Sequence, residues 1–221
     1  MKKLVFAWVG LLVASTALAS TEPAHLPSAA TVLSALKAGN ERHVKGQYKH
    51  PDETVARRQE LAKGQSPHAV VLTCADSRVP PEIVFDQGLG DLFVIRVAGN
   101  VAPDAEVASI EYAVEHLHTP LVVVMGHQSC GAVGAAIAGE EAPGHLPALI
   151  DAIKPAVDEA RTQKGDLSDN AVRVNVERVV EQLRTSEPIL GPAVKAGHLQ
   201  IVGAVYALDT GRVAWLPEST H

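Results

Sequence analysis

The sequence has few cysteines, no basic cluster and no long apolar run after its first residues. Two cysteines in 221 residues allow at most one disulfide bond within the chain, so a scaffold held by several disulfides is excluded. The formal net charge is −6 and the Lys and Arg residues are scattered, which argues against a nucleic-acid-binding surface. No internal repeat or low-complexity linker divides the chain, which indicates one domain with a full hydrophobic core.

Residues 1–19, MKKLVFAWVGLLVASTALA, have the pattern of a secretory signal peptide. Two lysines precede a short apolar core, and Ala17-Leu18-Ala19 supplies an A-x-A cleavage site. The core is short for a transmembrane helix, which needs about 20 apolar residues. We therefore expect cleavage after Ala19, a single mature domain over residues 20–221, export to a bacterial periplasm, and no membrane span after signal removal.

Short apolar runs alternate with helical patterns along the rest of the chain. The runs suit strands that are buried on both faces of a parallel sheet, and they cover residues 69–73, 92–97, 121–125 and 199–205, with 213–216 as an additional edge strand. Helices are expected over 28–45, 52–63, 104–117, 131–138, 147–161 and 169–185, the first two opening at Ser28 and Asp52. The alternation predicts an α/β fold with a mostly parallel central sheet flanked by helices.

Two cysteines and a histidine follow two of these predicted strands. Cys74 comes directly after the run 69–73, and His127 and Cys130 follow the run 121–125. Because parallel strands end at the same edge of a sheet, we expect these side chains to lie close together. Two thiolates and one imidazole suit zinc, and three protein ligands leave a fourth position open, as in catalytic zinc sites. A disulfide between Cys74 and Cys130 is the alternative for an exported chain.

The segment Cys74-Ala75-Asp76-Ser77-Arg78 adds a carboxylate and a guanidinium beside the first cysteine. A spacing of two residues in a loop lets Asp76 and Arg78 form a bidentate ion pair, which keeps the carboxylate ionised and oriented. Such a carboxylate could ligate a metal or accept the proton of a metal-bound water. The alternative is a solvated surface ion pair, which would contribute little.

Together these residues resemble the β-class carbonic anhydrases. The signature is C-x-D-x-R at 74–78 followed by H-x-x-C-G at 127–131, and the resemblance covers residues 28–207. It implies the reversible hydration of CO2 to bicarbonate and a proton, by attack of a zinc-bound hydroxide on CO2. It also implies one Zn2+ per subunit, held by Cys74, His127 and Cys130, with Asp76 and Arg78 as the catalytic dyad.

The resemblance further implies a substrate pocket and an assembly. The pocket residues would be Gln65, Phe93, Ala98, Tyr112 and Gly131. Among them, Tyr112 would come from the partner subunit, and Gly131 would offer its backbone N–H to bicarbonate. The implied assembly is a homo-oligomer, a dimer or a dimer of dimers, with an N-terminal helical arm that reaches across the dimer.

One position bears on regulation. Some family members have a tryptophan three residues before the first cysteine, as part of a bicarbonate site that lets the dyad aspartate swing onto zinc. This sequence has Val71 there, although Arg96 is at its expected place. We therefore expect an open, plant-like site without bicarbonate regulation. Three other functions remain open at this point: a hydrolase of carbonyl sulfide or carbon disulfide on the same fold, a non-catalytic exported zinc-binding protein, and a hydrolase with Cys130 as nucleophile.

Overall fold

The computed structural model describes residues 27–217, so the predicted signal peptide lies outside the described residues. The core is a five-stranded sheet with the order β2-β1-β3-β4-β5. The first four strands in this order are parallel, and β5 pairs with β4 in the antiparallel direction. The strands are β1 (Ala69–Thr73), β2 (Leu92–Arg96), β3 (Leu121–His127), β4 (Gln200–Tyr206) and β5 (Val213–Trp215). The α/β fold with a mostly parallel sheet is confirmed.

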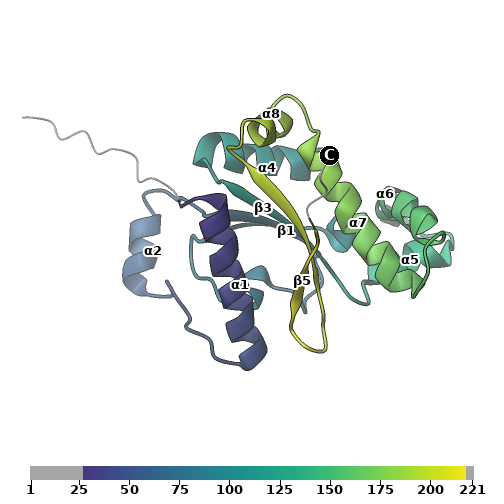
Figure 1. Cartoon of the computed structure of the whole chain (residues 1–221), viewed down its shortest axis with the longest axis horizontal. Coiled ribbons are helices and arrows are strands. Elements are labelled where there is room, and N and C mark those ends of the chain that lie inside the picture. The colour runs from purple at the N-terminus through teal and green to yellow at the C-terminus, as the bar shows by residue number, and fades with distance from the viewer. Residues whose placement is uncertain (1–26, 218–221) are drawn as a thin grey trace, which may run out of the picture.

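Helices cover both faces of this sheet (Figure 1). They are α1 (Ala29–Lys45), α2 (Val55–Leu61), α3 (Pro81–Val84), α4 (Asp104–Leu117), α5 (Gly131–Ala138), α6 (Leu146–Ala160), α7 (Leu167–Arg184) and α8 (Leu190–Lys195), with a 3-10 turn η1 (Ala98–Asn100). Alternate residues of the four parallel strands enter two apolar clusters, one against α1, α5 and α6 and the other against α4 and α8. Helix α7 contributes to both clusters, because it packs against β3 and β4 of the sheet and also against α6. Among residues 27–217, no helix has the length and apolar character that a bilayer crossing requires.

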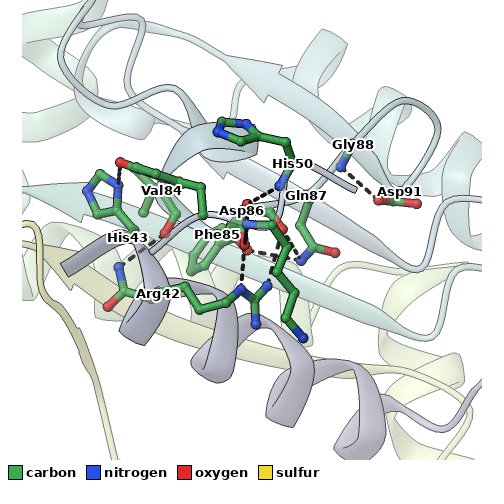
Figure 2. A network of polar contacts seen from close by, with 12 residues as sticks. Arg42, His43, His50, Val84, Phe85, Asp86, Gln87, Gly88 and Asp91 are labelled. Atoms are coloured by element: carbon green, nitrogen blue, oxygen red, sulfur yellow. Dashed lines mark hydrogen bonds and ion pairs between the residues drawn. The ribbon is translucent and has the colours of Figure 1, made fainter. Parts of the chain in front are cut away.

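The N-terminal arm is fixed to the loop between α3 and β2 by a buried carboxylate. Asp86 is 2% exposed and accepts backbone N–H bonds from Lys49 at 3.0 Å and His50 at 3.1 Å. It also pairs with the guanidinium of Arg42 on α1 (Figure 2). One carboxylate thus holds both the end of α1 and the loop that follows it.

The structure differs from the sequence-based expectations at the ends of several elements, among them α2, β3 and α7, which begins at Leu167 instead of residue 169. Helix α2 begins at Val55 instead of Asp52, because Asp52 has a φ of 54°, in the left-handed region. The hydroxyl of Thr54 caps this helix by accepting the N–H of Arg57 at 3.1 Å. Strand β3 continues to His127, two residues beyond its predicted end, because its last residues pair with β4. By contrast, the Ser28 cap of α1 is confirmed, since its hydroxyl accepts the N–H of Thr31 at 3.3 Å.

Candidate metal centre

Strand register brings the two cysteines and the histidine to one edge of the sheet. Thr73, the last residue of β1, pairs with Met125 of β3, so Cys74 emerges beside the end of β3. His127 is the last residue of β3, and Cys130 is the N-cap of α5. The ligand atoms of Cys74, His127 and Cys130 all lie within 4.8 Å of one another. The structure therefore assembles the predicted cluster from segments that are more than fifty positions apart in sequence.

The imidazole of His127 has one nitrogen committed and one free for a metal. His127 is 1% exposed, and its Nδ1 lies 2.9 Å from the carbonyl oxygen of Gln128. A carbonyl can only accept, so Nδ1 carries the hydrogen and Nε2 carries the lone pair. Nε2 is buried and has no hydrogen-bond partner among the described residues. A buried nitrogen without a partner costs free energy unless it binds something, so this atom fits a metal ligand.

The two thiols are buried side by side, with their sulfur atoms within 4.8 Å. Cys74 is 4% exposed and Cys130 is 3% exposed. The hydrogen bond with Cys130 lowers the pKa of Cys74 to about 4, whereas that same contact and burial raise the pKa of Cys130. For His127, burial alone would lower the pKa, but the adjacent Cys74 thiolate, together with the bond to the Gln128 carbonyl, outweighs burial and raises it. A bound divalent cation would favour loss of the Cys130 proton as well, because the thiolate is the form of cysteine that binds zinc.

Asp76 is held next to this cluster by Arg78. The Arg78 Nε and Nη2 atoms donate to the two carboxylate oxygens at 2.9 and 2.7 Å, and its backbone N–H donates at 2.9 Å. The hydrogen bond from Arg78 holds the pKa of Asp76 well below its usual range. The Oδ2 atom of Asp76 lies 3.8 Å from Nε2 of His127, so the carboxylate faces the cluster. The predicted bidentate pair is thus present.

Three hydrogen bonds, from Arg96 and Gly99, fix the loop that carries Cys74. Arg96, at the end of β2, donates through Nε to the Cys74 carbonyl at 3.0 Å and through Nη2 to the Asp76 carbonyl. The backbone N–H of Gly99, in η1, donates to the Cys74 sulfur at 3.4 Å. The loop and its sulfur are therefore oriented from β2 and from the turn that follows it.

The comparisons with known proteins agree on one family. A family model described as carbonic anhydrase matches residues 69–213. Carbonic anhydrase 2 of Mycobacterium tuberculosis is 45% identical over 182 residues, which cover 80% of this chain and 88% of that protein. The carbonic anhydrase of Mycolicibacterium smegmatis is 43% identical over 183 residues, covering 81% and 89%.

The solved structures that match the chain include carbonic anhydrases of the β class. The β-carbonic anhydrase CcaA superposes with a TM-score of 0.66 at 29% identity, covering 83% of this chain and 94% of that chain. The chain belongs to the β-class carbonic anhydrases. A structure reported for two tetrameric β-carbonic anhydrases from Sordaria macrospora also matches, with a TM-score of 0.68, 25% identity, and coverage of 87% and 100%. In a β-class carbonic anhydrase, the Cys74, His127 and Cys130 cluster corresponds to one zinc ion per subunit.

The predicted pocket residues divide into two groups. Ala98 opens η1 beside Gly99, and Gly131 follows Cys130 directly, so both adjoin the cluster. Phe93 instead pairs with Val70 near the start of β2. A strand rises ~3.3 Å per residue, so Phe93 lies about 10 Å from the edge of the sheet that carries the cluster.

The other two residues belong to the distant group. The ring of Tyr112 on α4 lies 6.3 Å from that of Phe93, and Gln65 precedes β1 and so lies beyond its opposite end. Within one chain, Gln65, Phe93 and Tyr112 are therefore not part of the metal centre.

The sequence analysis missed Asn175 of α7, which is 3% exposed and donates to the Gly99 carbonyl at 2.8 Å. Its only signal in the sequence is an amide between Val174 and Val176 on a face that is otherwise apolar.

Both cysteines are free thiols in this structure, so the alternative disulfide is not formed.

Proposed function

We propose that this chain is a zinc-dependent carbonic anhydrase that catalyses the reversible hydration of CO2 to bicarbonate and a proton. The observation that carries the proposal is the convergence of three buried ligand atoms within 4.8 Å, beside a carboxylate that is locked to an arginine. A structural zinc site ordinarily has four Cys or His ligands, and only three converge among the described residues. This arrangement favours a catalytic site over a purely structural one.

We assign the zinc ligands as Cys74, His127 and Cys130. When bound, zinc supplies the activation of a water molecule for attack on CO2 near neutral pH. The bond from His127 Nδ1 to the Gln128 carbonyl orients the ring so that Nε2 faces the ion. The N–H of Gly99 keeps the Cys74 sulfur in place.

Asp76 and Arg78 would orient the reaction. With both Asp76 oxygens held by Arg78, the carboxylate stays ionised and accepts a hydrogen bond from the attacking oxygen, which directs its lone pair at CO2. Ala98 would border the apolar space for CO2. The backbone N–H of Gly131, at the start of α5, would donate to bicarbonate.

The remaining pocket residues would come from a partner subunit of a homo-oligomer. Gln65, Phe93 and Tyr112 lie away from the zinc ligands of their own chain, and Tyr112 is 48% exposed. The reported tetrameric state of the Sordaria macrospora relatives supports an assembly of identical subunits. A dimer is the smallest assembly in which one chain could complete the pocket of another.

We propose that the site is open at neutral pH. Val71 is fully buried in β1, and both guanidinium contacts of Arg96 go to the loop carbonyls of Cys74 and Asp76. Asp76 points both oxygens at Arg78, so rotation onto zinc would break two charge-assisted hydrogen bonds.

The pattern of residues 1–19 supports export to the periplasm. Expression of the full sequence in a Gram-negative host tests this. We expect the periplasmic fraction to contain a protein whose first residue is Ser20. Retention of Met1 in a cytoplasmic protein would contradict it.

Stopped-flow CO2 hydration by zinc-loaded residues 20–221, scanned from acid to alkaline pH, tests the function. We expect hydration at neutral pH that is lost on chelation and restored by zinc. Hydration that begins only at alkaline pH would contradict the open site. No hydration at any pH by protein shown to hold zinc would contradict the function, and hydrolysis of carbonyl sulfide or carbon disulfide would then be assayed.

A further inference from the structure

We propose that Asn175 of α7 is a positioning residue for the zinc ligand Cys74, acting through the backbone of Gly99. The inference rests on the proposed zinc site and adds a residue that lies 76 positions from the turn it holds. It concerns a side chain that touches neither ligand atoms nor substrate. Its effect would be on the affinity and geometry of the metal centre.

The contact chain has two hydrogen bonds. The Nδ2 group of Asn175 donates to the Gly99 carbonyl at 2.8 Å, in a buried setting. The N–H of the same glycine donates to the Cys74 sulfur at 3.4 Å. The bond to the Gly99 carbonyl restricts the ψ angle of Gly99. Because the φ angle is set by the turn, the direction of the Gly99 N–H is then restricted as well. Helix α7 thereby determines which way the hydrogen-bond donor to the sulfur points.

The turn that contains Gly99 is also closed by a backbone hydrogen bond, from the N–H of Asn100 to the Val97 carbonyl at 3.0 Å, but that bond does not engage the Gly99 carbonyl. Gly99 has a φ of 73°, a left-handed conformation that glycine adopts at least cost. A Cβ at this position would lie 2.5 Å from Ile153 of α6, so no side chain of its own could brace the turn. The Nδ2 atom of the adjacent Asn100 is buried without a partner among the described residues. The amide of Asn175 is thus the side-chain donor that holds Gly99.

Helix α7 also offers a matched comparison. Gln182 lies seven residues after Asn175, two turns along the same helix, and its Nε2 donates to the Ala102 carbonyl at 2.7 Å. Both amides therefore bind backbone carbonyls of the segment 98–102. The difference is that Ala102 makes no contact with the Cys74 sulfur among the described contacts, whereas Gly99 does. Outer-shell partners of metal ligands typically change metal affinity by about 10–100-fold when removed.

Three alanine variants, made in residues 20–221, separate positioning from stability. Asn175→Ala removes the proposed bond, and Gln182→Ala removes the comparison bond. Val179→Ala removes buried apolar contacts one turn after Asn175, at a residue that is 5% exposed, so it controls for loss of packing in α7. Asn175→Asp, which keeps the shape but replaces the donor, is the second variant if Asn175→Ala does not fold. For each protein, zinc affinity is measured by chelator competition, and the cobalt-substituted form is examined for its thiolate-to-cobalt absorption band.

We expect Asn175→Ala to raise the zinc dissociation constant by about 10–100-fold and to shift the cobalt band. Gln182→Ala and Val179→Ala are expected to retain the wild-type affinity and band, although Val179→Ala unfolds at lower urea concentration. Wild-type zinc affinity and an unshifted cobalt band in Asn175→Ala would overturn the inference. Equal losses of zinc affinity in all three variants would also overturn it. So would failure of both Asn175 variants to fold while Val179→Ala folds, since Asn175 would then be needed for folding and not for positioning Cys74. Absence of zinc binding by the wild-type protein would instead overturn the proposed function.

Discussion

The orientation of Asp76 depends at the residue scale on one exposed guanidinium. The side chain of Arg78 is 53% exposed and that of Asp76 is 19% exposed, so water could take the place of the ion pair at little cost in stability. Water would not fix the direction in which the carboxylate points. In the proposed reaction, the pair therefore matters for the geometry of the attack more than for folding.

Arg78→Ala tests this directly. We expect kcat/KM for CO2 hydration to fall roughly 100-fold, the scale typical of a lost positioning or proton-accepting contact. Zinc content and urea stability should stay near wild type. Arg178→Ala is the matched control, because Arg178 is 50% exposed and pairs with Glu159 at 3.2 Å far from the cluster in sequence. Equal activity of the two variants would show that Arg78 does not orient the reaction.

Asp86, unlike Asp76, is a buried carboxylate whose role is in the fold. Burial alone would raise the pKa of Asp86, but the hydrogen bonds from Arg42, Lys49 and His50 outweigh burial and lower it. The folded protein therefore releases this proton more readily than the unfolded chain. The resulting stabilisation is complete above the unfolded-state pKa of about 4 and is lost as the pH falls through the lower folded-state pKa.

Asp86→Asn should consequently cost stability in a pH-dependent way. At pH 7 we expect the free energy of unfolding to fall by about 2 kcal/mol, because a charged acceptor of several hydrogen bonds is replaced. The gap between wild type and variant should narrow below about pH 4. Urea unfolding at several pH values measures both effects. Glu41→Gln, at a half-exposed acid next to Arg42 on α1, provides the control and should show neither the loss nor the narrowing.

At the scale of elements, a second buried amide joins three of them. Asn40 of α1 is 4% exposed and donates to the carbonyls of Val84 and Gly211 at 3.2 and 2.9 Å. Its Oδ1 atom accepts the N–H of Val213 at 2.9 Å. One side chain thus fastens α1 to the end of α3 and to the hairpin between β4 and β5.

We expect Asn40→Ala to lower the free energy of unfolding by about 3 kcal/mol, since three buried backbone groups lose their partner. Zinc affinity of the folded variant should not change, because none of these contacts reaches the metal centre. Asn170→Ala, which removes an exposed bond to the Lys164 carbonyl, is the control and should cost less than about 1 kcal/mol. A similar loss in both variants would contradict a clamp at Asn40.

These elements also mark how far the sequence could be interpreted. Continuous apolar runs located four parallel strands, because strands that are buried on both faces have little polar alternation. Local patterns gave the Ser28 cap but missed the short helices α3 and α8, whose four and six residues carry no periodic signal. The Pro80-Pro81 pair was a cue for the start of α3, since proline suits the first helical position.

The candidate site was predictable where it depends on ligand chemistry and strand order. Cys74, His127 and Cys130 follow from residue types placed at the ends of parallel strands, and Asp76 follows from its spacing to Arg78. The contact between Asn175 and Gly99 was not predictable, because it joins residues 76 positions apart through the packing of α7. The position of Arg96 gave no indication that its guanidinium binds two loop carbonyls.

At the scale of the whole molecule, the residues of the proposed site are divided between two ends of the sheet. The proposed zinc ligands and dyad lie at the carboxyl edge, whereas Phe93 and Tyr112 pack together away from it. Residues from both ends of the sheet can serve one reaction if one subunit places its Tyr112 beside the zinc ligands of its partner. A chain with an inactive dyad could then still donate its pocket residues to a partner.

Mixing two inactive variants tests this arrangement. Arg78→Ala lacks the dyad, and Tyr112→Ala lacks the donated ring; each alone should have low activity as a homodimer. If Tyr112 acts across the interface, a heterodimer contains one complete site, with Arg78 from one chain and Tyr112 from the other. Random re-association of equal amounts should therefore restore about a quarter of the wild-type activity, since half of the dimers are mixed and each has one of two sites intact. If Tyr112 serves its own chain, every site in the mixture lacks one group and the activity stays at the level of the separate variants.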